Sequence, residues 1–430
     1  MPSFSVLTLG CKVNSYESEA VISNLIDHGF VFKNFNDICD VYIINTCTVT
    51  QTSDQKSRQM IHKARRLNKD AVIVAMGCYS QLNQDEALSM ADIVIGNNNK
   101  MNLYSLIDSY LKTKEQITEV VDLMDKPIYE EMKVSKLLTH TRGFIKIQDG
   151  CENYCSYCAI PYSRGKIRSR NADNIIDEIK ELVLNGTKEI ILSGINTGAY
   201  GKDLNNYNLA KLIERIMEET SIYRVRISSI ELMEISDELL DVIKNYPDRI
   251  AHHFHVPAQA GVDSVLKRMH RKYDIKTYEE RIQRIRNIFP DVAISTDLLA
   301  GFVGETEEEF QSLKEFMYRI NYSFIHVFPY SKRKGTEAYL MNGHLDKKVQ
   351  EERCHELINI GNELTDKFIK SNLNKEFDII VENKKNDYYH GHSSNYLDIY
   401  FKSDKSLVNE IVKVKALNYI DGVIYGEMEE

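Results

Sequence analysis

The stretch GFIKIQDGCENYCSYCAIPYSRGKIRSR (143–170) joins a predicted strand, GFIKIQ, to three closely spaced cysteines, Cys151, Cys155 and Cys158. Three thiolates at this spacing can hold three irons of a cubane 4Fe–4S cluster, whereas most such clusters take four cysteines. The fourth iron is then open to an external ligand. The alternative is zinc, which normally takes four ligands and often binds paired cysteines. We therefore expect an iron–sulfur centre just after this strand.

The strand begins a segment that repeats one strand–helix unit, from 143 to about 366. Five further apolar runs predict strands at 188–194, 223–229, 251–256, 291–297 and 323–328. Helical patterns alternate with them at 172–185, 207–219, 236–246, 262–288 in two pieces, and 306–318. Because six units fall short of the eight in a TIM barrel, we expect an α/β fold with a partial, open (β/α)6 barrel.

The first 125 residues alternate strands and helices in a second pattern. Apolar runs at 5–10, 41–46, 71–77 and 91–96 predict buried parallel strands, with helices at 16–29 and 53–67. This βαβα order predicts an open doubly wound parallel sheet.

Three more cysteines stand just past strands of that sheet. Cys11 follows SVLTLG, Cys47 follows VYIINT and Cys78 follows AVIVAMG. The carboxyl ends of parallel strands share one edge, where open α/β sheets place their sites. A single cysteine so placed is more often an ordinary buried residue, but three equivalent placements favour a second three-cysteine centre. Cys39 and Cys354 lack this context, and we expect them to be packing or surface residues.

The remaining two segments differ in composition from the first two. Residues 126–142 are charged and aperiodic, which predicts a linker. Residues 367–430 contain short strands separated by Asn, Asp, Gly and Ser, which predicts a small antiparallel barrel of the OB-like kind that handles RNA. We therefore expect three domains, at 1–125, 137–366 and 367–430.

The charge balance is acidic, with 54 Lys and Arg against 63 Asp and Glu, a net charge of −9. This excludes a uniformly basic nucleic-acid coat and gives no support for a DNA-binding protein, but it allows local basic patches. MPSFSVLTLG (1–10) has no basic leader region, and no apolar run reaches the roughly 18 residues of a membrane helix. We expect a cytoplasmic protein with no membrane attachment, whose thiols stay reduced.

Taken together, the motifs resemble those of the radical S-adenosylmethionine (SAM) methylthiotransferases. The spacing Cys151-x3-Cys155-x2-Cys158, with Tyr157 before the last cysteine, matches the radical-SAM signature. TLGCKVNSYESE, INTCTVT and MGCYSQ match the N-terminal motifs, and IPYSRGKIRSR, SGINTGAYG, RISSIE, HVPAQAG, TDLLAGFVGETEEEF and FPYSKRKGT match along the barrel. HVPAQAG departs from the commoner HxPxQSG, with Ala260 in place of serine. The resemblance is essentially full length and implies a cluster domain, a radical-SAM barrel and a C-terminal TRAM domain.

The resemblance also implies the chemistry, since the cofactors carry radical steps that side chains cannot. It implies two 4Fe–4S clusters. The barrel cluster, at Cys151, Cys155 and Cys158, binds and cleaves SAM to give a deoxyadenosyl radical that attacks C2 of an adenine. The N-terminal cluster, at Cys11, Cys47 and Cys78, supplies sulfur, and a second SAM donates the methyl group.

The substrate follows from the first cysteine motif. GCKVNSYE resembles the branch that acts on N6-threonylcarbamoyladenosine at position 37 of tRNA. GCQMN is typical of the isopentenyl-adenosine branch and GCPKN of the branch that modifies a ribosomal-protein aspartate, so these substrates are the alternatives. An iron–sulfur electron carrier or RNA-binding protein without catalysis is the alternative outside enzymes.

Position and the resemblance together predict the residues that contact SAM. They lie in the cluster loop or at the carboxyl ends of barrel strands, where barrel sites form. The alternative is that the Ser and Gly residues simply make turns. The predicted residues are Tyr157, Ser193, Gly194, Ser228, Ser229 and Gln259.

Acidic and histidine residues lie near the same strand ends. His253 and His255 point the same way from a predicted strand, and we expect packing or substrate contact rather than metal binding. Asp297 and Glu305 are expected to contact substrate or SAM, or to cap the helix after Thr306.

The expected partner is a tRNA anticodon stem-loop with its target base splayed out. Residues 51–70 and 261–290 each carry a net charge of +4, and 330–335 adds three cations, although charge runs are most often solvated faces. Residues 371–430 carry a net charge of −4, so we expect RNA contact there to depend on a few lysines or on stacking tyrosines. The candidates are Lys384, Lys385, Lys413 and Lys415, or Tyr388, Tyr389, Tyr396 and Tyr400. We also expect an electron donor of flavodoxin or ferredoxin type and a sulfur-supply system.

Overall fold

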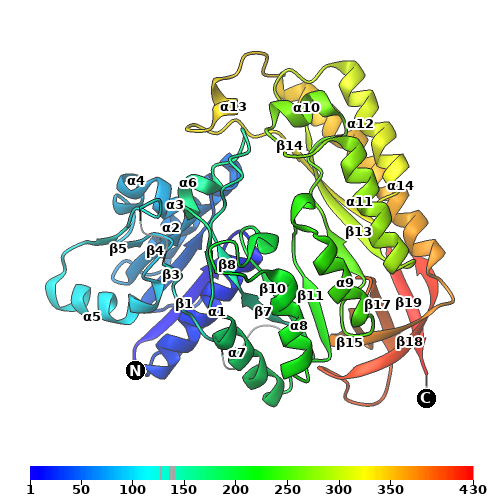
Figure 1. The fold of residues 1–430 in the computed structure, drawn as a ribbon. Coiled ribbons are helices and arrows are strands. Elements are labelled where there is room, and N and C mark those ends of the chain that lie inside the picture. The colour runs from blue at the N-terminus through cyan, green and yellow to red at the C-terminus, as the bar shows by residue number, and fades with distance from the viewer. Residues whose placement is uncertain (126–127, 135–136, 138–140, 430) are drawn as a thin grey trace.

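The N-terminal unit is a six-stranded parallel sheet in the order β2-β1-β3-β4-β5-β6 (Figure 1). The computed structural model describes residues 1–125, 128–134, 137 and 141–429. The four strands predicted for this unit are confirmed as β1, β3, β4 and β5. The edge strands β2 and β6 escaped prediction because their exposed and half-exposed residues form no apolar run. The strands are β1 (Ser3–Thr8), β2 (Val31–Phe32), β3 (Val41–Thr46), β4 (Val72–Gly77), β5 (Ile93–Ile95) and β6 (Ile117–Glu119).

Helices cover both faces of this sheet, as a doubly wound fold requires. Ile43 and Val74 pack on one side with α1 (Lys12–Asp27) and α5 (Leu103–Thr113). Ile44 and Ile73 pack on the other with α2 (Gln51–Leu67) and the short helices α3 (Cys78–Leu82) and α4 (Gln84–Leu88). Alternate residues of each strand therefore pack into two hydrophobic cores, one on each face of the sheet, and the predicted fold class is confirmed.

The six predicted barrel strands are all present and parallel. They form two three-stranded sheets, β11-β10-β7 and β12-β13-β14. Isolated parallel bridges between Val225 and Ile250 and between Ser229 and His255 connect the two sheets into an open, partial barrel. The strands are β7 (Gly143–Lys146), β10 (Glu189–Ser193), β11 (Arg224–Ile227), β12 (His253–His255), β13 (Ala293–Ala300) and β14 (Phe324–Pro329).

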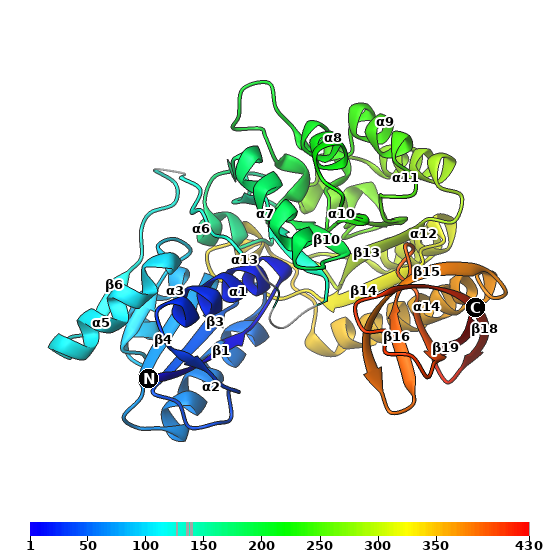
Figure 2. The same ribbon diagram turned by 90° about the horizontal axis from the view of Figure 1, so that it is seen from below.

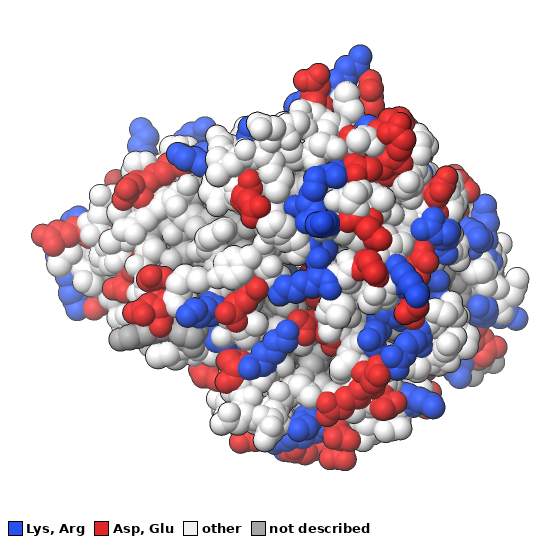
Figure 3. All heavy atoms as spheres, turned by 45° about the horizontal axis from the view of Figure 1, so that its top comes forward, with Lys and Arg blue, Asp and Glu red and all other residues white. Residues whose placement is uncertain are grey.

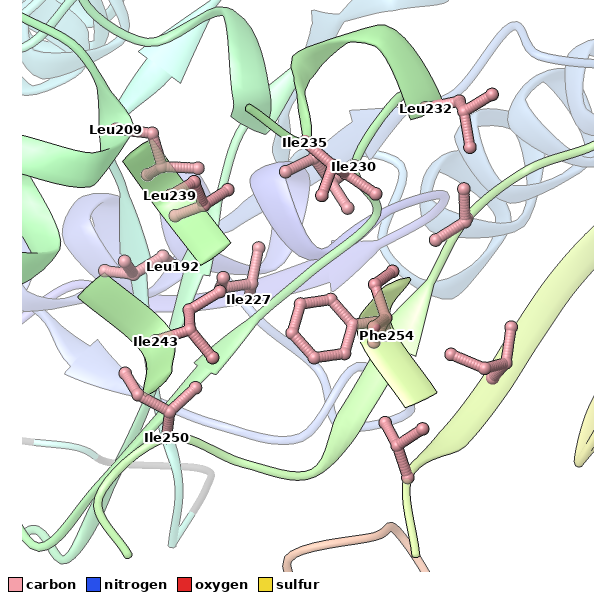
Figure 4. Packing of buried hydrophobic residues seen from close by; sticks show 14 of the residues in the cluster. Leu192, Leu209, Ile227, Ile230, Leu232, Ile235, Leu239, Ile243, Ile250 and Phe254 are labelled. Atoms are coloured by element: carbon pink, nitrogen blue, oxygen red, sulfur yellow. The ribbon is translucent and has the colours of Figure 1, made fainter. Parts of the chain in front are cut away.

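Helices on the outside of the barrel pack against the strands through apolar residues. Figure 4 shows Leu209 and Leu239 from helices facing Leu192, Ile227 and Phe254 from strands. The outer helices are α7 (Ala172–Leu184), α8 (Leu209–Glu219), α9 (Asp237–Asn245), α10 (Asp263–Arg268), α11 (Ile275–Ile288) and α12 (Glu307–Ile320). Shorter elements are β8 (Gln148–Asp149), α6 (Ile160–Arg164), β9 (Arg168–Ser169) and α13 (Glu337–Leu340).

A long helix, α14 (Lys347–Ser371), leads to the C-terminal unit, a closed five-stranded barrel in the order β15-β16-β17-β19-β18. The pairs are antiparallel except β17 with β19, which is parallel. The predicted small antiparallel barrel is therefore confirmed, with one parallel pair. Its strands are β15 (Glu376–Lys385), β16 (Tyr388–His392), β17 (Asp398–Lys402), β18 (Ile411–Ile420) and β19 (Val423–Met428).

Figures 1 and 2 both place the N-terminal sheet and the closed barrel at opposite ends of the molecule, with the partial barrel between them. The predicted linker, 126–142, falls partly outside the described residues. Part of its described length is packed: Met132 and Val134 are buried, and the Met132 carbonyl accepts a hydrogen bond from the Tyr16 hydroxyl at 2.7 Å. Among the described residues, no helix is long and apolar enough to cross a membrane.

Candidate functional site

The three N-terminal cysteines follow β1, β3 and β4 at the carboxyl edge of the sheet, as predicted. Gly10 shows how closely the first two segments approach each other. A Cβ on Gly10 would lie 2.9 Å from both Cβ and Sγ of Cys47, and its φ of +101° is one that side chains rarely adopt. Glycine is therefore required here for Cys11 and Cys47 to share one edge.

A buried guanidinium from the barrel segment reaches this edge. Arg164, at the end of α6, donates from Nε to Cys78 Sγ at 3.1 Å and from Nη2 to Asn14 Oδ1 at 2.6 Å. Its Nη1 lies 2.7 Å from Glu17 Oε1 and 3.2 Å from Asp149 Oδ2.

The same two carboxylates contact three further buried cations. Lys100 pairs with Glu17 at 2.7 Å, Lys146 pairs with Glu17 at 2.8 Å and with Asp149 at 2.7 Å, and Arg168 pairs with Asp149 at 3.1 Å. Burial alone would raise the pKa of Glu17, but Arg164, Lys100 and Lys146 lower it well below its usual range. Four cations around two carboxylates leave positive charge beside the cysteines, which favours an anionic group there.

The second trio lies in the loop after β8. A Cβ on Gly150 would lie 1.9 Å from the Lys166 carbonyl oxygen, so only glycine fits the start of this loop. Cys155 Sγ accepts a hydrogen bond from Arg271 Nη1 at 3.5 Å, and Arg271 is held by Glu231 at 2.5 Å. Each trio is thus contacted by one arginine that a carboxylate holds in place.

Burial keeps four of the six thiols from reacting freely. Burial raises the pKa of Cys47 and of Cys151 to about 11, and it raises the pKa of Cys11 and Cys158 as well. These thiols are therefore protonated at neutral pH, and an iron that replaces the proton makes them ligands.

The described residues include no group of three His, Cys, Asp or Glu side chains arranged to hold a single metal ion. In a cubane each cysteine binds a different iron, so its ligands need not converge on one point. Three thiols at each place fit a cluster that keeps one iron open to another ligand.

A cavity of about 790 Å³ joins the three units. Cys11 lines it from the N-terminal sheet, Ser193 and Ser229 from the barrel, and Tyr396 and Ile424 from the C-terminal unit. A second cavity, of about 760 Å³, shares Gly10 and Cys11 and adds Cys47. Cys11 therefore lies where the two cavities meet. The volume of each cavity is in the range typical of small-molecule sites.

Four of the residues predicted to contact SAM lie in the wall of the first cavity: Ser193, Gly194, Ser228 and Ser229. The Ser228 hydroxyl is hydrogen-bonded to that of Thr197 at 2.9 Å. A Cβ on Gly194 would lie 2.8 Å from Gln148 Oε1, so packing inside the protein already requires glycine there.

Tyr157 and Gln259 are not part of the described lining of this cavity. Tyr157 packs edge-on against Phe302, with ring centroids 6.2 Å apart. Gln259 has a φ of +66° and pairs through its backbone with Asp297 and Leu299. A role in SAM contact stays a prediction for all six residues.

His253 and His255 both line the cavity and both hydrogen-bond to the Ser295 hydroxyl, at 2.8 and 2.9 Å. The prediction that they point the same way is confirmed. His253 also stacks on Tyr396, with centroids 4.6 Å apart and an interplanar angle of 12°. Burial and Arg226 lower the pKa of His253 well below its usual value, which keeps its ring neutral.

Asp297 and Glu305 have different environments. Asp297 lines the cavity, with Oδ2 3.3 Å from Nε2 of His255. Glu305 is buried, accepts from Gly301 N at 3.0 Å and pairs with Arg353 at 2.7 Å. The cap of α12 is Thr306 itself, so neither carboxylate caps that helix.

The lysine after Cys11 is a cavity residue that prediction missed. Burial, followed by the nearby Arg226 and Arg142, lowers the pKa of Lys12 to about 8, so its ammonium keeps its charge at neutral pH. Arg164 and Arg271 were missed too, because their partners lie far away in the sequence. The only signal for Arg164 was its place inside the IPYSRGKIRSR motif.

The tyrosines proposed for RNA stacking divide into two kinds. Tyr389 is buried in the core of the closed barrel against Phe401, so it presents no face to a base and that prediction is wrong. Tyr388 and Tyr400 stay half-buried, each within stacking range of Tyr425. Tyr396 lines the cavity.

The face shown in Figure 3 carries mixed charge, with Lys and Arg groups lying among Asp and Glu groups. Of the cations expected in 330–335, Arg333 is buried, pairs with Asp54 at 2.5 Å and donates to Thr48 at 2.6 Å. It therefore holds the α13 segment to α2 and does not face RNA.

Two family descriptions match the chain: the Radical SAM superfamily over residues 145–317, and Uncharacterized protein family UPF0004 over residues 3–96. Threonylcarbamoyladenosine tRNA methylthiotransferase MtaB of Bacillus subtilis is 40% identical over 97% of this chain and 94% of its own length. The protein of the same name from Aquifex aeolicus is 35% identical over 95% and 98%. A tRNA-2-methylthio-N(6)-dimethylallyladenosine synthase of Finegoldia magna is 31% identical over 99% and 94%.

Among solved structures, the radical S-adenosylmethionine methyltransferase TsrM from Kitasatospora setae, with cobalamin and a [4Fe-4S] cluster bound, is similar in fold. The TM-score is 0.53 at 15% identity, covering 76% of this chain and 75% of that one.

Proposed function

Since this chain belongs to the radical-SAM tRNA methylthiotransferases, we propose that it adds a methylthio group to C2 of N6-threonylcarbamoyladenosine at position 37 of tRNA. The choice of nucleoside is supported by identity. Four relatives named for threonylcarbamoyladenosine are 34–40% identical, against 31–32% for four named for dimethylallyladenosine.

Membership of the Radical SAM superfamily implies SAM and one 4Fe–4S cluster. We assign that cluster to Cys151, Cys155 and Cys158, and a second one to Cys11, Cys47 and Cys78. When bound, the first supplies the electron that cleaves SAM and the second supplies sulfur, while a further SAM supplies the methyl group.

The single observation that carries the proposal is the cavity that Cys11 shares with the barrel strand ends and the closed barrel. Apolar and aromatic walls there, such as Phe324, Phe328 and Tyr396, keep water from a flat base. Ser229 offers a hydroxyl group to its polar edge. A base splayed from the anticodon loop then lies beside the N-terminal centre.

The roles that we propose for the three units follow from this placement. We assign residues 1–125 to the second cluster, 137–366 to SAM and 367–430 to RNA, as a TRAM-type domain. Helix α14 runs through residue 366 to Ser371, and the first strand of the closed barrel begins at Glu376. We also propose a cytoplasmic location, a flavodoxin- or ferredoxin-type electron donor and a sulfur-supply system.

Nucleoside analysis of tRNA from a deletion strain tests the proposal. We expect 2-methylthio-N6-threonylcarbamoyladenosine to disappear and the unmethylthiolated nucleoside to accumulate. Loss of the isopentenyl-adenosine derivative instead would assign the alternative tRNA substrate, and an unchanged tRNA profile would contradict a tRNA substrate. Purified protein with both clusters reconstituted should release deoxyadenosine from SAM and reductant, which a non-catalytic iron–sulfur protein would not do.

A further inference from the structure

One positive charge stands in the wall of the cavity that holds Cys11. Lys12 is the single Lys or Arg in its lining, as far as the structure describes it. The two carboxylates of the lining already have histidine partners: Asp297 with His255 at 3.3 Å, and Asp398 with His390 at 2.9 Å. Lys12 is therefore the one Lys, Arg, Asp or Glu side chain of the described lining that has no direct hydrogen-bond or ion-pair partner.

The cations nearest to Lys12 show the contrast. Arg226 pairs with Glu189 at 2.9 Å and donates to the Ser393 carbonyl at 3.1 Å. Arg142 pairs with Glu382 at 3.1 Å. Within residues 1–125, 128–134, 137 and 141–429, the Lys12 ammonium has neither a hydrogen bond nor an ion pair. Burying a charge part-way without a partner costs free energy, so the protein gains nothing in stability from this lysine.

Its position on α1 leads to the same conclusion. Lys12 is the first residue of the helix, where the helix dipole disfavours a cation, and no acidic residue in the first turn offsets it. The arrangement becomes favourable when an anion lies beside Lys12 in the cavity.

The substrate proposed above supplies such an anion. N6-threonylcarbamoyladenosine carries a carboxylate at the end of its N6 substituent, whereas an isopentenyl substituent is uncharged. On adenine, C2 and C6 flank N1 on the same edge. A base whose C2 faces the centre at Cys11 therefore directs its N6 substituent along the adjoining wall, where the next residue is Lys12.

We propose that the Lys12 ammonium binds the carboxylate of the threonylcarbamoyl group and thereby selects an anionic N6 substituent over an uncharged one. This assignment rests on the proposed function. It makes Lys12 a specificity-determining residue in contact with substrate.

Three other anions are available to the same lysine: a tRNA phosphate, the carboxylate of SAM and the cluster assigned to Cys11. A phosphate contact would strengthen binding of every RNA equally, since each loop carries the same backbone. A SAM contact would change SAM affinity and leave the choice among RNAs as it was. A contact with the cluster would likewise leave the choice among RNAs unchanged, so the preference for the acid over the amide separates the proposed contact from all three.

The experiment measures the affinity of the reconstituted holoenzyme for fluorescein-labelled anticodon stem-loops by anisotropy. The loops differ only at residue 37: adenosine, N6-threonylcarbamoyladenosine, and the same nucleoside with its carboxylate converted to the primary amide. The wild-type protein should bind the acid about tenfold to a hundredfold more tightly than the amide, as expected for one charge-assisted contact.

Lys12→Met keeps the length of the side chain and removes its charge. We expect it to bind the acid and the amide equally, and Lys12→Arg to restore most of the preference. The control is Lys112→Met, which removes an exposed lysine of α5 that pairs only with Asp108, and it should behave like the wild type.

The outcomes are distinguishable. Three results for Lys12→Met would each overturn the assignment. The variant could still prefer the acid, it could lose affinity equally for all three loops, or it could lose only SAM affinity in a parallel SAM titration. If the wild-type protein binds the acid and the amide equally, Lys12 does not select the carboxylate, whereas failure of the proposed substrate shows separately in the nucleoside profile of the deletion strain.

Discussion

Arg164 Nε lies 3.1 Å from Cys78 Sγ, and this contact joins the barrel segment to the cysteine edge of the N-terminal sheet. The same guanidinium contacts Glu17 and Asp149, and all four side chains are buried. Because these residues come from both units, the arginine fixes how the N-terminal cysteines face the barrel.

Replacing Arg164 with Gln should destabilise the protein, because it removes one partner of a buried ionic network. Breaking a buried ion pair in this way costs about 3–5 kcal/mol. The midpoint of urea unfolding of the metal-free protein measures the loss. The control is Arg281→Gln, whose partner Asp237 is exposed and which should shift the midpoint little. Equal midpoints for the two variants would contradict the inferred role of Arg164.

Replacing Cys47 with Ala should separate the two chemistries assigned to the two trios. We expect the variant to keep releasing deoxyadenosine from SAM but to form no methylthio nucleoside, because only the N-terminal centre loses a ligand. Circular dichroism checks that it is folded, and Cys354→Ala, which changes a half-buried cysteine on α14, should retain both activities. A folded Cys47→Ala protein that releases no deoxyadenosine would sink the assignment of separate roles.

Replacing Tyr396 with Ala should weaken RNA binding, because its ring forms part of the cavity wall and packs against His253 and Arg226 there. Truncating an aromatic side chain of a binding wall costs about 1–2 kcal/mol, so we expect a loss of roughly tenfold in affinity. Tyr396→Phe keeps the ring and should keep most of the affinity. Tyr318→Ala, at an exposed position on α12, is the matched control, and a similar loss in that variant would argue against a role of the cavity wall.

Acid should weaken the junction between the partial barrel and the closed barrel through Glu189. Burial raises the pKa of this carboxyl, but Arg226 and Arg224 outweigh it and lower the pKa from 4.5 to about 2. Both arginines also donate to backbone carbonyls of the C-terminal unit, including those of Asp378 and Ser393.

Because the folded-state pKa lies below the ordinary one, the stabilisation is complete above pH 4.5 and is lost as the pH falls toward 2. Its size is on the order of 3 kcal/mol. Unfolding measured across this pH range should show a steep loss of stability that Glu189→Gln flattens. Glu219→Gln, at an exposed ion pair with Arg215, should leave the slope unchanged; if it flattens the profile as much, Glu189 is not the group responsible.

Most strands of the two parallel units were predictable because they contain apolar runs, as in EIILS at 189–193, whereas the edge strands β2 and β6 contain none. The cysteine placement was predictable for the same reason: once β1, β3 and β4 are parallel neighbours, Cys11, Cys47 and Cys78 must follow one edge.

Side-chain partnerships were not predictable, because they join distant segments. Glu17 and Arg164 are 147 residues apart, and nothing in either neighbourhood indicates the other. Tyr389 and Tyr396 looked equivalent as aromatic residues of short strands. Closure of the barrel buries the first in its core and leaves the second in the cavity wall.

The wall of the cavity joins residues from the two ends of the described chain, from Gly10 to Ile424. Gly422 and Ile424 belong to the C-terminal unit, so this side of the cavity exists only when that unit is folded against the partial barrel. A change that loosens the closed barrel should therefore open the cavity beside Cys11, although it lies far from the cysteines in the sequence.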